Sequence, residues 1–352
     1  MGKIKIGIIG IGNCASALIQ GIEYYRKTNN GGLTRPKLAG YHITDIEIVA
    51  AIDISKNKVG KDITKAIFEN DLEPFITFAN EINVPVVMGT ILDGIIKETE
   101  RVINPSSEPS VNFNEYFKST GAEIILCLLP SGANNAVKFY AQEALKAGCA
   151  FINATPTRIA TDEEISKDFL DAGLPLIGDD LQDQFGATIL HKMILQQMID
   201  RGIDIKESYA LDVGGGSESL NTIYRTREVK RKIKSNSVAG ALHIDAPIVA
   251  GTSDWVDFLE NKRNTMLWIV GKGFMGSEIV MDIKIQTEDG PNGGSILADI
   301  IRVTKVALNQ GDAGSIDEIS AYGFKNPPKP PKNPAEASRN LANFILGMKR
   351  EG

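Results

Sequence analysis

Residues 3–15 read KIKIGIIGIGNCA, and this stretch decides the fold. The apolar, β-branched run at residues 3–9 is typical of a strand that is buried on both faces of a parallel sheet. Gly10, Gly12 and Ala15 follow it in the spacing G-x-G-x-x-A. There the first glycine permits a tight turn, the second lets the backbone approach a pyrophosphate, and the small third residue permits close helix packing. The stretch therefore predicts a turn that binds a dinucleotide.

A helix and a second strand complete the expected unit. Apolar residues at positions 15, 18, 19 and 22 recur at helical spacing, and residues 46–53, IEIVAAID, form the next apolar run. Asp53 ends that run, where a carboxylate accepts hydrogen bonds from ribose hydroxyls and disfavours a 2′-phosphate. It comes later than the usual interval of about 20 residues after the glycines, so the first crossover must contain an insertion. These features predict NAD as the cofactor, bound by Gly10, Gly12, Asn13, Cys14, Ala15 and Asp53.

Strand-like and helical segments continue to alternate through the first half of the chain. Further strands are expected at residues 84–89, 122–130, 149–154 and 174–178. Such alternation predicts an α/β fold built on a Rossmann-like, doubly wound parallel sheet.

From residue 189 the pattern changes, because one long helix precedes the segments SYALDVGG, LWIVGKGF and EIVMDIKIQT. These are expected to be antiparallel strands of a second, α+β domain for catalysis and oligomerisation. Residues 296–308 are expected to form a helix that returns to the first domain. The proline-rich residues 327–334 are expected to be extended. The predicted boundaries are 1–188 for the NAD-binding domain, 189–298 for the second domain and 299–352 for the return.

Composition excludes several classes of function. The 352 residues carry a net charge of −6, which argues against a nucleic-acid-binding surface, since phosphate neutralisation needs a basic excess. Three cysteines give neither a disulfide framework nor a metal-ligand spacing, so no metal site is expected. The start of the chain lacks a signal-peptide pattern, and no long apolar stretch could span a membrane. We therefore expect a cytoplasmic protein.

Three polar segments are candidates for the site, each with a plainer alternative. Residues 130–135, PSGANN, follow a strand end and open a helix, where Pro130, Ser131, Gly132 and Asn135 could face the cofactor; helix capping alone would also select them. Asp179 and Asp180 follow another strand end and could orient a nicotinamide or a lysine, or be ordinary loop acids.

The third segment is residues 224–234, YRTREVKRKIK, preceded by three glycines at 214–216. Its basic residues are either a solvated helix face or a cover over a phosphorylated ligand. The glycines supply the flexible, N–H-rich backbone that anion sites use, which favours the ligand. The three histidines and two tryptophans show no catalytic grouping, and core or surface roles are expected for them.

Several motifs in order resemble NAD-dependent myo-inositol-phosphate synthases of the short bacterial and archaeal form. The motifs include GIGNCASALIQGIEYY at 10–25, LPSGANNAVKFYAQ at 129–142, DAGLPLIGDD at 171–180, GATILH at 186–191, GTSDWVDFLENKR at 251–263 and DGPN at 289–292. The likeness covers nearly the whole chain. It implies a Rossmann domain, a tetramerising catalytic domain, a homotetramer, glucose 6-phosphate as the substrate and NAD as a recycled cofactor.

The resemblance also implies which residues carry the chemistry, and the chain departs from the family at several of them. Gln182 and Asp183 stand where the family has a lysine and a serine, and residues 214–218 read GGGSE in place of Gly-Gly-Asn-x-Asp. Counted without gaps from Asn221, two further family lysines fall on Arg231 and Ser235, and a third falls on Arg263. The catalytic residues implied are Lys284, Lys325, Asp180, Arg231, Arg263, Glu218 and Lys234, and Asp179 and Asp289 join the cofactor-binding set.

Three hypotheses remain at this stage. The chain makes inositol phosphate from glucose 6-phosphate, with Lys234 or Lys262 replacing displaced neighbours. Alternatively, it acts on another sugar or polyol phosphate as an NAD-dependent oxidoreductase, epimerase or cyclase. The arginines that stand in place of family lysines favour this hypothesis, because arginine scarcely gives up a proton. The third hypothesis is a homologue that binds ligands without catalysis.

Overall fold

The first domain is built on a parallel sheet, as the sequence predicts. The computed structural model describes residues 2–29, 31–69, 72, 74–78, 80–97, 103–242 and 246–347. Within this part of the chain the sheet has seven strands in the order β13-β8-β7-β6-β1-β4-β5, and all neighbours pair in parallel. Its strands are β1 (Ile4–Ile9), β4 (Ile46–Asp53), β5 (Val86–Met88), β6 (Ile124–Cys127), β7 (Ala150–Asn153), β8 (Pro175–Ile177) and β13 (Gly314–Ser315). All six expected strands are confirmed.

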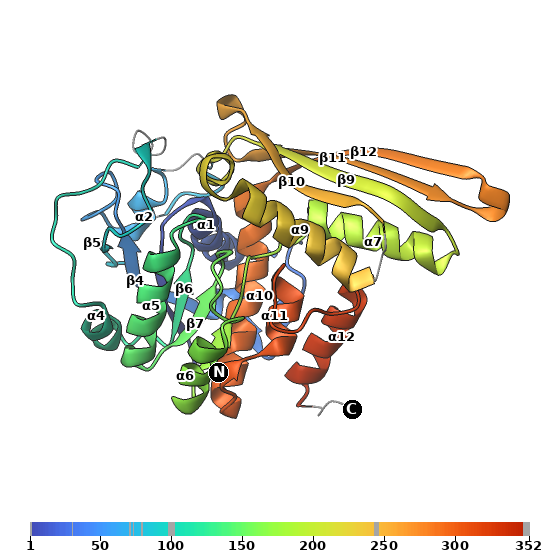
Figure 1. Ribbon diagram of the computed structural model, residues 1–352. Helices are drawn as coiled ribbons and strands as arrows, with labels where there is room; N and C mark the ends of the chain where they lie inside the picture. Colours follow the sequence, from blue (N-terminus) through green and yellow to red (C-terminus); the bar gives the residue numbers. More distant parts are fainter. Residues whose placement is uncertain are drawn as a thin grey trace.

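Helices cover both faces of this sheet (Figure 1). One face packs on α1 and α10 through residues such as Ile6, Leu18 and Leu297, and the other packs on α4, α5 and α6 through Phe117, Tyr140 and their neighbours. The helices of this domain are α1 (Asn13–Lys27), α2 (Ile63–Ala66), α4 (Phe113–Thr120), α5 (Asn134–Ala147), α6 (Glu163–Asp171), α10 (Asp289–Gln310), α11 (Asp317–Gly323) and α12 (Pro334–Ile345). The insertion in the first crossover contains β2 (Lys37–Leu38), β3 (Tyr41–His42) and a 3-10 turn (Ile43–Asp45).

The long helix α10 begins seven residues earlier than expected, at Asp289. Pro291 is tolerated because the first turn of a helix leaves its N–H groups unpaired. Gly293 and Gly294 let α10 approach α1 closely. A side-chain carbon at Gly293 would lie 2.9 Å from Cys14 Sγ, and one at Gly294 would lie 3.1 Å from Leu18 N.

The second domain is a sheet of four strands in the described residues, in the order β10-β9-β11-β12. Strands β9, β11 and β12 are antiparallel as expected, but β10 pairs in parallel with β9. The strands are parallel because the chain between them, which forms α8, a π-helical turn and α9, crosses back to the end of the sheet where β9 begins. The elements are α7 (Ala187–Asp200), β9 (Asp204–Gly214), α8 (Ser217–Asn221), the π turn (Thr222–Thr226), α9 (Arg227–Leu242), β10 (Ile248–Trp255), β11 (Lys262–Lys272), β12 (Glu278–Glu288) and 3-10 turns at Asp257–Leu259 and Phe274–Gly276. Helices α7 and α9 lie along one face of this sheet (Figure 1).

The C-terminal segment corrects one expectation. Residues 326–331 are not helical, but Pro334 begins α12 instead of extending the chain. Proline suits the first helical position, where its missing N–H is not needed. The side chain of Asn333 caps this helix by accepting a hydrogen bond from the Glu336 N–H. No helix in the described residues is long and apolar enough to cross a membrane. His243 lies outside the described residues.

Candidate active site

A cavity of about 350 Å³ opens where the two sheets meet. It lies at the carboxyl ends of β1, β4, β6 and β8, the edge where open α/β sheets bind ligands, and the second domain closes its other side. Of the expected site residues, those that line it are Gly10, Gly12, Asn13, Cys14, Ala15, Asp53, Pro130, Ser131, Asp180, Glu218, Lys234, Arg263, Asp289 and Lys325.

The glycine turn has the geometry of an anion site. Gly10 has a φ of +87°, and a side-chain carbon there would lie 2.8 Å from Leu128 O, so only glycine fits. Nothing lies within 4 Å of the corresponding position at Gly12, so the backbone is open to the cavity there. Helix α1 starts directly afterwards without a side-chain cap. Its first N–H groups are thus available to a phosphate.

Asp53 supports this turn from the end of β4. Its Oδ2 accepts the Ile11 N–H at 2.8 Å, and its Oδ1 accepts the N–H groups of Ile54 and Ser55. Lys58 reaches across the same place, donating to Ile11 O at 2.8 Å, with its ammonium 3.7 Å from Asp53. Each carboxylate oxygen has two lone pairs, so Oδ1 is fully used and Oδ2 retains the capacity to accept one ribose hydroxyl.

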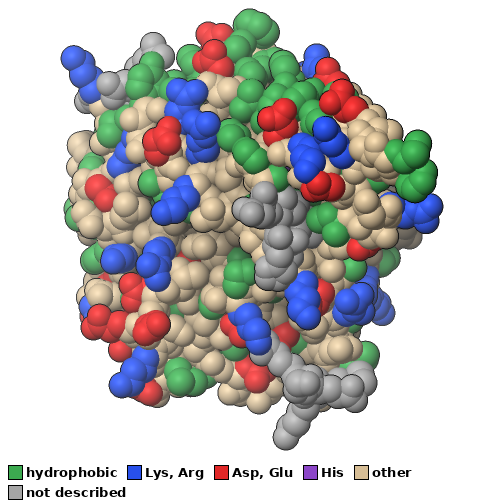
Figure 2. Space-filling model, turned by 45° about the vertical axis from the view of Figure 1, so that its right-hand side comes forward, with side chains coloured by type: hydrophobic (Ala, Val, Ile, Leu, Met, Phe, Trp, Pro, Cys, Tyr) green, Lys and Arg blue, Asp and Glu red, His purple; other side chains and the backbone are tan. Residues whose placement is uncertain are grey.

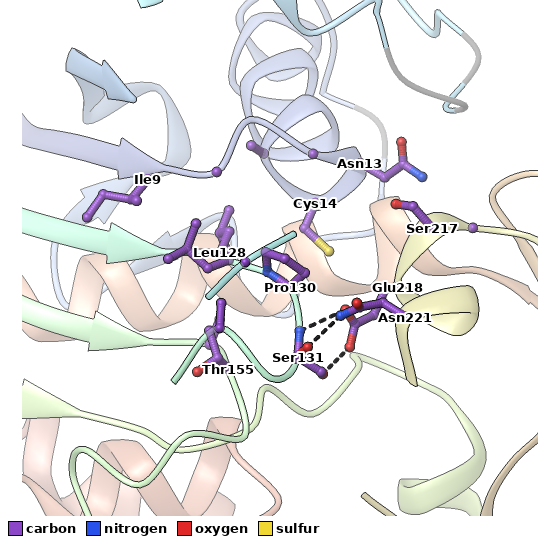
Figure 3. Close-up of a pocket in the computed structure, with 18 of the residues that line it drawn as sticks. Ile9, Asn13, Cys14, Leu128, Pro130, Ser131, Thr155, Ser217, Glu218 and Asn221 are labelled. Carbon is purple, nitrogen blue, oxygen red and sulfur yellow. Dashed lines mark hydrogen bonds between the residues drawn. The ribbon is translucent and has the colours of Figure 1, made fainter. Parts of the chain in front are cut away.

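The loop after β6 is fastened to the second domain (Figure 3). Glu218 accepts hydrogen bonds from both the N–H and the hydroxyl of Ser131, and Asn221 donates to Ser131 O. Arg225 donates to Gly132 O at 2.6 Å. These contacts join α8 and the π turn to the loop that faces the glycine turn, so the cavity is roofed by both domains.

Four cations and their carboxylate partners form one wall of the cavity. Lys325 Nζ lies 3.3 Å from Asp180, Lys230 Nζ lies 2.7 Å from Glu218, and Arg263 binds Asp289 through two parallel hydrogen bonds of 2.6 and 2.8 Å. Lys234 donates to Asp212, whose other oxygen accepts from the Thr265 hydroxyl. Buried pairs of this kind need further hydrogen bonds to offset their desolvation.

Burial and pairing shift the two lysines of α9 in opposite directions. Burial acts to lower the pKa of Lys230, but the charges of Glu218 and Asp180 outweigh it and raise that pKa. For Lys234 burial dominates, and its partner Asp212 offsets it only in part, so the pKa of Lys234 is lowered. The pKa of Arg263 rises well above its usual value, because Asp289 and Asp212 outweigh the effect of burial. Lys230 and Arg263 therefore stay charged, and of these three Lys234 is the one that can most readily give up a proton.

Burial alone would raise the pKa of Asp180. The charges of Lys325 and Lys230 outweigh this effect and hold the pKa of Asp180 below its usual value. Asp180 is therefore ionised. Its Oδ1 faces Lys325, while its buried Oδ2 has no partner among the described residues. One carboxylate oxygen at the cavity is thus open to a ligand hydroxyl.

On α9 the expected positions are displaced by one residue. Arg231 is exposed, and the hydroxyl oxygen of Ser235 accepts the Ala250 N–H of β10, whereas Lys230 and Lys234 face the cavity. Successive residues of an α-helix point about 100° apart, so an offset of one residue turns Arg231 away from the cavity and Lys230 into it. A gap-free count from Asn221 is therefore wrong by one position.

Four more expected residues lie away from the cavity. Lys284 is exposed on β12, and it pairs across the sheet with Met266, which is also exposed, so it points from the outer face. Asp179 is fully buried and accepts the N–H groups of residues 159, 160 and 161, which fix the turn there. Gly132 is covered by Arg225, and Asn135 is exposed, its N–H bound to Asp93.

Three residues of the site are not among those singled out from the sequence, although Lys230 belongs to the candidate segment 224–234. Lys230, Asp212 and Asp183 line the cavity or complete its ion pairs. Asp212 could have been found from the alternation along β9, whose buried face carries Ser208, Ala210 and then this carboxylate. Lys230 lies four residues before the expected site residue Lys234, so the two share a helix face. This spacing could have identified Lys230 from the sequence.

Comparison with known proteins decides the family. The sequence profile described as Myo-inositol-1-phosphate synthase matches residues 186–290. An inositol-3-phosphate synthase of Mycolicibacterium smegmatis is 35% identical over 98% of this chain and 99% of that protein. The chain belongs to the inositol-phosphate synthase family. A second inositol-3-phosphate synthase, from Corynebacterium glutamicum, is also 35% identical, over 97% of this chain and 98% of its own length.

Two solved structures share the fold of this chain. The crystal structure of Ari2 is 28% identical and superposes with a TM-score of 0.76 over 98% of each chain. A myo-inositol-1-phosphate synthase-related protein from Thermotoga maritima shares the fold, with a TM-score of 0.78 at 20% identity, over 99% of this chain and 100% of its own. The family profile spans α7 through the start of α10, which is the part that carries Glu218, the α9 lysines and Arg263.

Proposed function

We propose that this member of the inositol-phosphate synthase family converts glucose 6-phosphate to myo-inositol phosphate with NAD as a recycled cofactor. The observation that carries the proposal is that a dinucleotide-type glycine turn and a wall of four cations face each other in the same cavity. The reaction oxidises C5 to a ketone, removes a proton from C6, joins C6 to C1 by aldol addition and reduces the ketone again. It needs a redox site beside a site that stabilises oxyanions and holds a phosphate.

The residues present fit NAD. The open backbone at Gly12 and the uncapped start of α1 suit the pyrophosphate, and Asp53 suits the ribose hydroxyls. When bound, NAD would accept a hydride from the substrate and later return it. Ser131 and Thr155 line the same side of the cavity and, with Pro130, would position the ring that reacts (Figure 3).

We assign roles on the cation wall from charge and burial. Lys230 and Arg263 stay charged, and would bind phosphate oxygens and the enolate oxygen. Lys234, whose pKa is lowered chiefly by burial, would move the proton at C6 while Asp212 orients its ammonium. Asp180 would accept a substrate hydroxyl through its unpartnered Oδ2 and orient Lys325 through its Oδ1.

A second candidate function is favoured by one observation. Gln182 is buried and neutral at a position where a family lysine is expected, Asp183 adds a carboxylate where a serine is expected, and Glu218 is a longer acid in place of an aspartate. These differences favour a different sugar or polyol phosphate as the substrate. The protein would then be an NAD-dependent oxidoreductase, an epimerase or another cyclase.

One reaction separates the candidates. The purified protein is incubated with NAD and glucose 6-phosphate, and the products are identified by phosphorus NMR and mass. Inositol phosphate without net NADH is the expected result. Net NADH, or another isomer as the product, would contradict the proposal and support the second function, while NAD binding without turnover of a panel of sugar phosphates would support a homologue that only binds ligands.

We also propose a homotetramer, built through the outer face of the four-stranded sheet. Met266 and Val280 are about half exposed on this face, Tyr209 and Trp268 stack there, and Phe274 and Met275 stand out at the β11–β12 turn. An apolar face of this kind is typical of an interface. Light scattering should give the mass of four chains, and of fewer for Met266→Glu with Val280→Glu; a wild-type monomer would contradict the tetramer.

A further inference from the structure

Lys192 is a buried lysine that the roles above leave unused. It lies on α7, its side chain is 5% exposed, and its Nζ donates to Gln182 Oε1 at 3.2 Å. Among the described residues no carboxylate lies within ion-pair distance of it, so its charge is met only by a neutral amide. A buried ammonium without a counter-charge is costly, which raises the question of what compensates it.

The partner of Lys192 connects it directly to the cation wall. The Gln182 N–H donates to Gly323 O, and the Lys325 N–H donates to Asp180 O, so both belong to the short antiparallel bridge that pairs Leu181 with Phe324. Gln182 therefore stands at one end of this bridge, and the Asp180–Lys325 pair stands at the other. Lys192 itself does not line the cavity, but it contacts Gln182 and is repelled by the charge of Lys325.

The charges around this bridge do not balance. Of the two ammonium groups, that of Lys325 is paired with the Asp180 carboxylate, whereas that of Lys192 meets only the Gln182 amide. Burial, followed by repulsion from Lys325, lowers the pKa of Lys192 to about 8. An anion that entered the cavity beside Lys325 would supply the missing negative charge.

Charged groups on the elements around α7 are already engaged. His191 of α7 is held in its neutral form, since burial lowers its pKa to about 4. Lys234 of α9 is paired with Asp212 of β9, and Arg263 of β11 binds both Asp212 and Asp289. On α12, the Glu336 carboxylate accepts the Lys332 N–H, and Arg339 is exposed.

We propose that Lys192 is a positioning residue of the sugar-phosphate site, which takes up a proton from solvent when an anionic ligand fills the cavity beside Asp180 and Lys325. The proton adds to the free amine of Lys192 and no other bond changes. The ammonium then polarises the Gln182 amide and attracts the ligand through it. The proposal deepens the proposed function and rests on it, because that function supplies the phosphate-bearing ligand.

Calorimetry tests proton uptake directly. Glucose 6-phosphate, and separately inorganic phosphate as a probe, is titrated into the NAD-loaded protein at about pH 8.5 in buffers of different ionisation enthalpy. A sugar phosphate is already a dianion at this pH, since its second pKa is about 6, so uptake reports on the protein. The wild type should take up well over half a proton for each ligand bound.

Two variants distinguish a charge from a structural role. Lys192→Met should abolish the uptake and weaken binding roughly tenfold, the effect of one charge about 12 Å away at an effective dielectric of about 20. Lys192→Arg keeps a permanent charge, so it should bind as tightly as the wild type but take up no proton. Lys206→Met, on the exposed side of β9, is the matched control and should behave as the wild type.

The outcomes separate this proposal from the proposed function. Equal uptake in the wild type and Lys192→Arg would overturn the role of Lys192 even if inositol phosphate is made. Uptake that depends on Lys192 in a protein that makes no inositol phosphate would support this role and overturn only the named reaction. If neither ligand binds, both proposals are wrong.

Discussion

On α9 a step of one residue separates a side chain in the cavity from one in solvent. Lys230 is paired with Glu218 inside, and the neighbouring Arg231 is exposed. Successive residues on an α-helix differ by about 100° in direction, so these two cations cannot share a role. Substituting Lys230 and Arg231 separately therefore tests whether the cavity is the active site.

Lys230→Met should lower kcat/KM for glucose 6-phosphate by on the order of 10² to 10³, because the site loses a permanent cation and leaves Glu218 buried without its partner. Arg231→Met should stay within about twofold of the wild type. Steady-state kinetics on both variants checks this. The assignment fails if Arg231→Met is the more damaged of the two.

Residues tied to backbone geometry could be predicted from the sequence. Gly10, Gly12 and Asp53 line the cavity because a strand end and a turn fix their positions. The direction in which a side chain leaves its helix or strand could not be predicted. Arg231, which follows the π turn, points outward, and Lys284 lies on the outer face of β12. Asp179 lies away from the cavity because it accepts three N–H groups of residues 159–161, and its own neighbours in the sequence do not indicate these contacts.

At the level of elements, α7 carries a histidine whose protonation opposes folding. Ser208 donates to Trp268 O and is 2.6 Å from His191 Nε2, so the ring donates through Nε2–H. Its Nδ1 is buried without a partner among the described residues. Protonation would place an N–H there with no acceptor, and burial lowers the pKa of His191 to about 4.

Between pH 6.5 and about 4 the unfolded chain binds a proton at His191 that the folded chain does not, so the free energy of unfolding should fall as the pH falls. The loss should reach about 3 kcal/mol for this group. His191→Phe has no group that titrates at this position, so its free energy of unfolding should fall by about that much less than that of the wild type. Urea unfolding of both proteins at pH 7 and pH 4.5 measures the difference, and parallel losses would refute it.

Element boundaries show why the second half of the fold was harder to predict than the first. The strands of the first sheet are continuous apolar runs, so they stand out in the sequence. The start of α10 contains a proline and three glycines, which suggest a turn, but close packing on α1 requires small residues there. Likewise β10 pairs in parallel because of the crossover before it, which its own sequence does not encode.

At the scale of the whole molecule, the charge is mixed over the surface and ordered within the cavity. Figure 2 shows acidic and basic side chains interspersed among the described residues of the face in view. Inside, four cations meet their carboxylates beside the glycine turn. In the proposed function the two domains join a nucleotide site to a sugar-phosphate site, and our central claim is that oxidation and reduction both occur in this one cavity.

Glucose 6-phosphate that carries deuterium at C5 tests this claim most directly. The protein is supplied with unlabelled NAD and an excess of unlabelled NADH, and the inositol phosphate is analysed by mass and NMR. If the hydrogen removed from C5 is held in the cavity and returned there, the deuterium is retained in full at that carbon. Loss of the deuterium, or its dilution by the added NADH, would contradict the account.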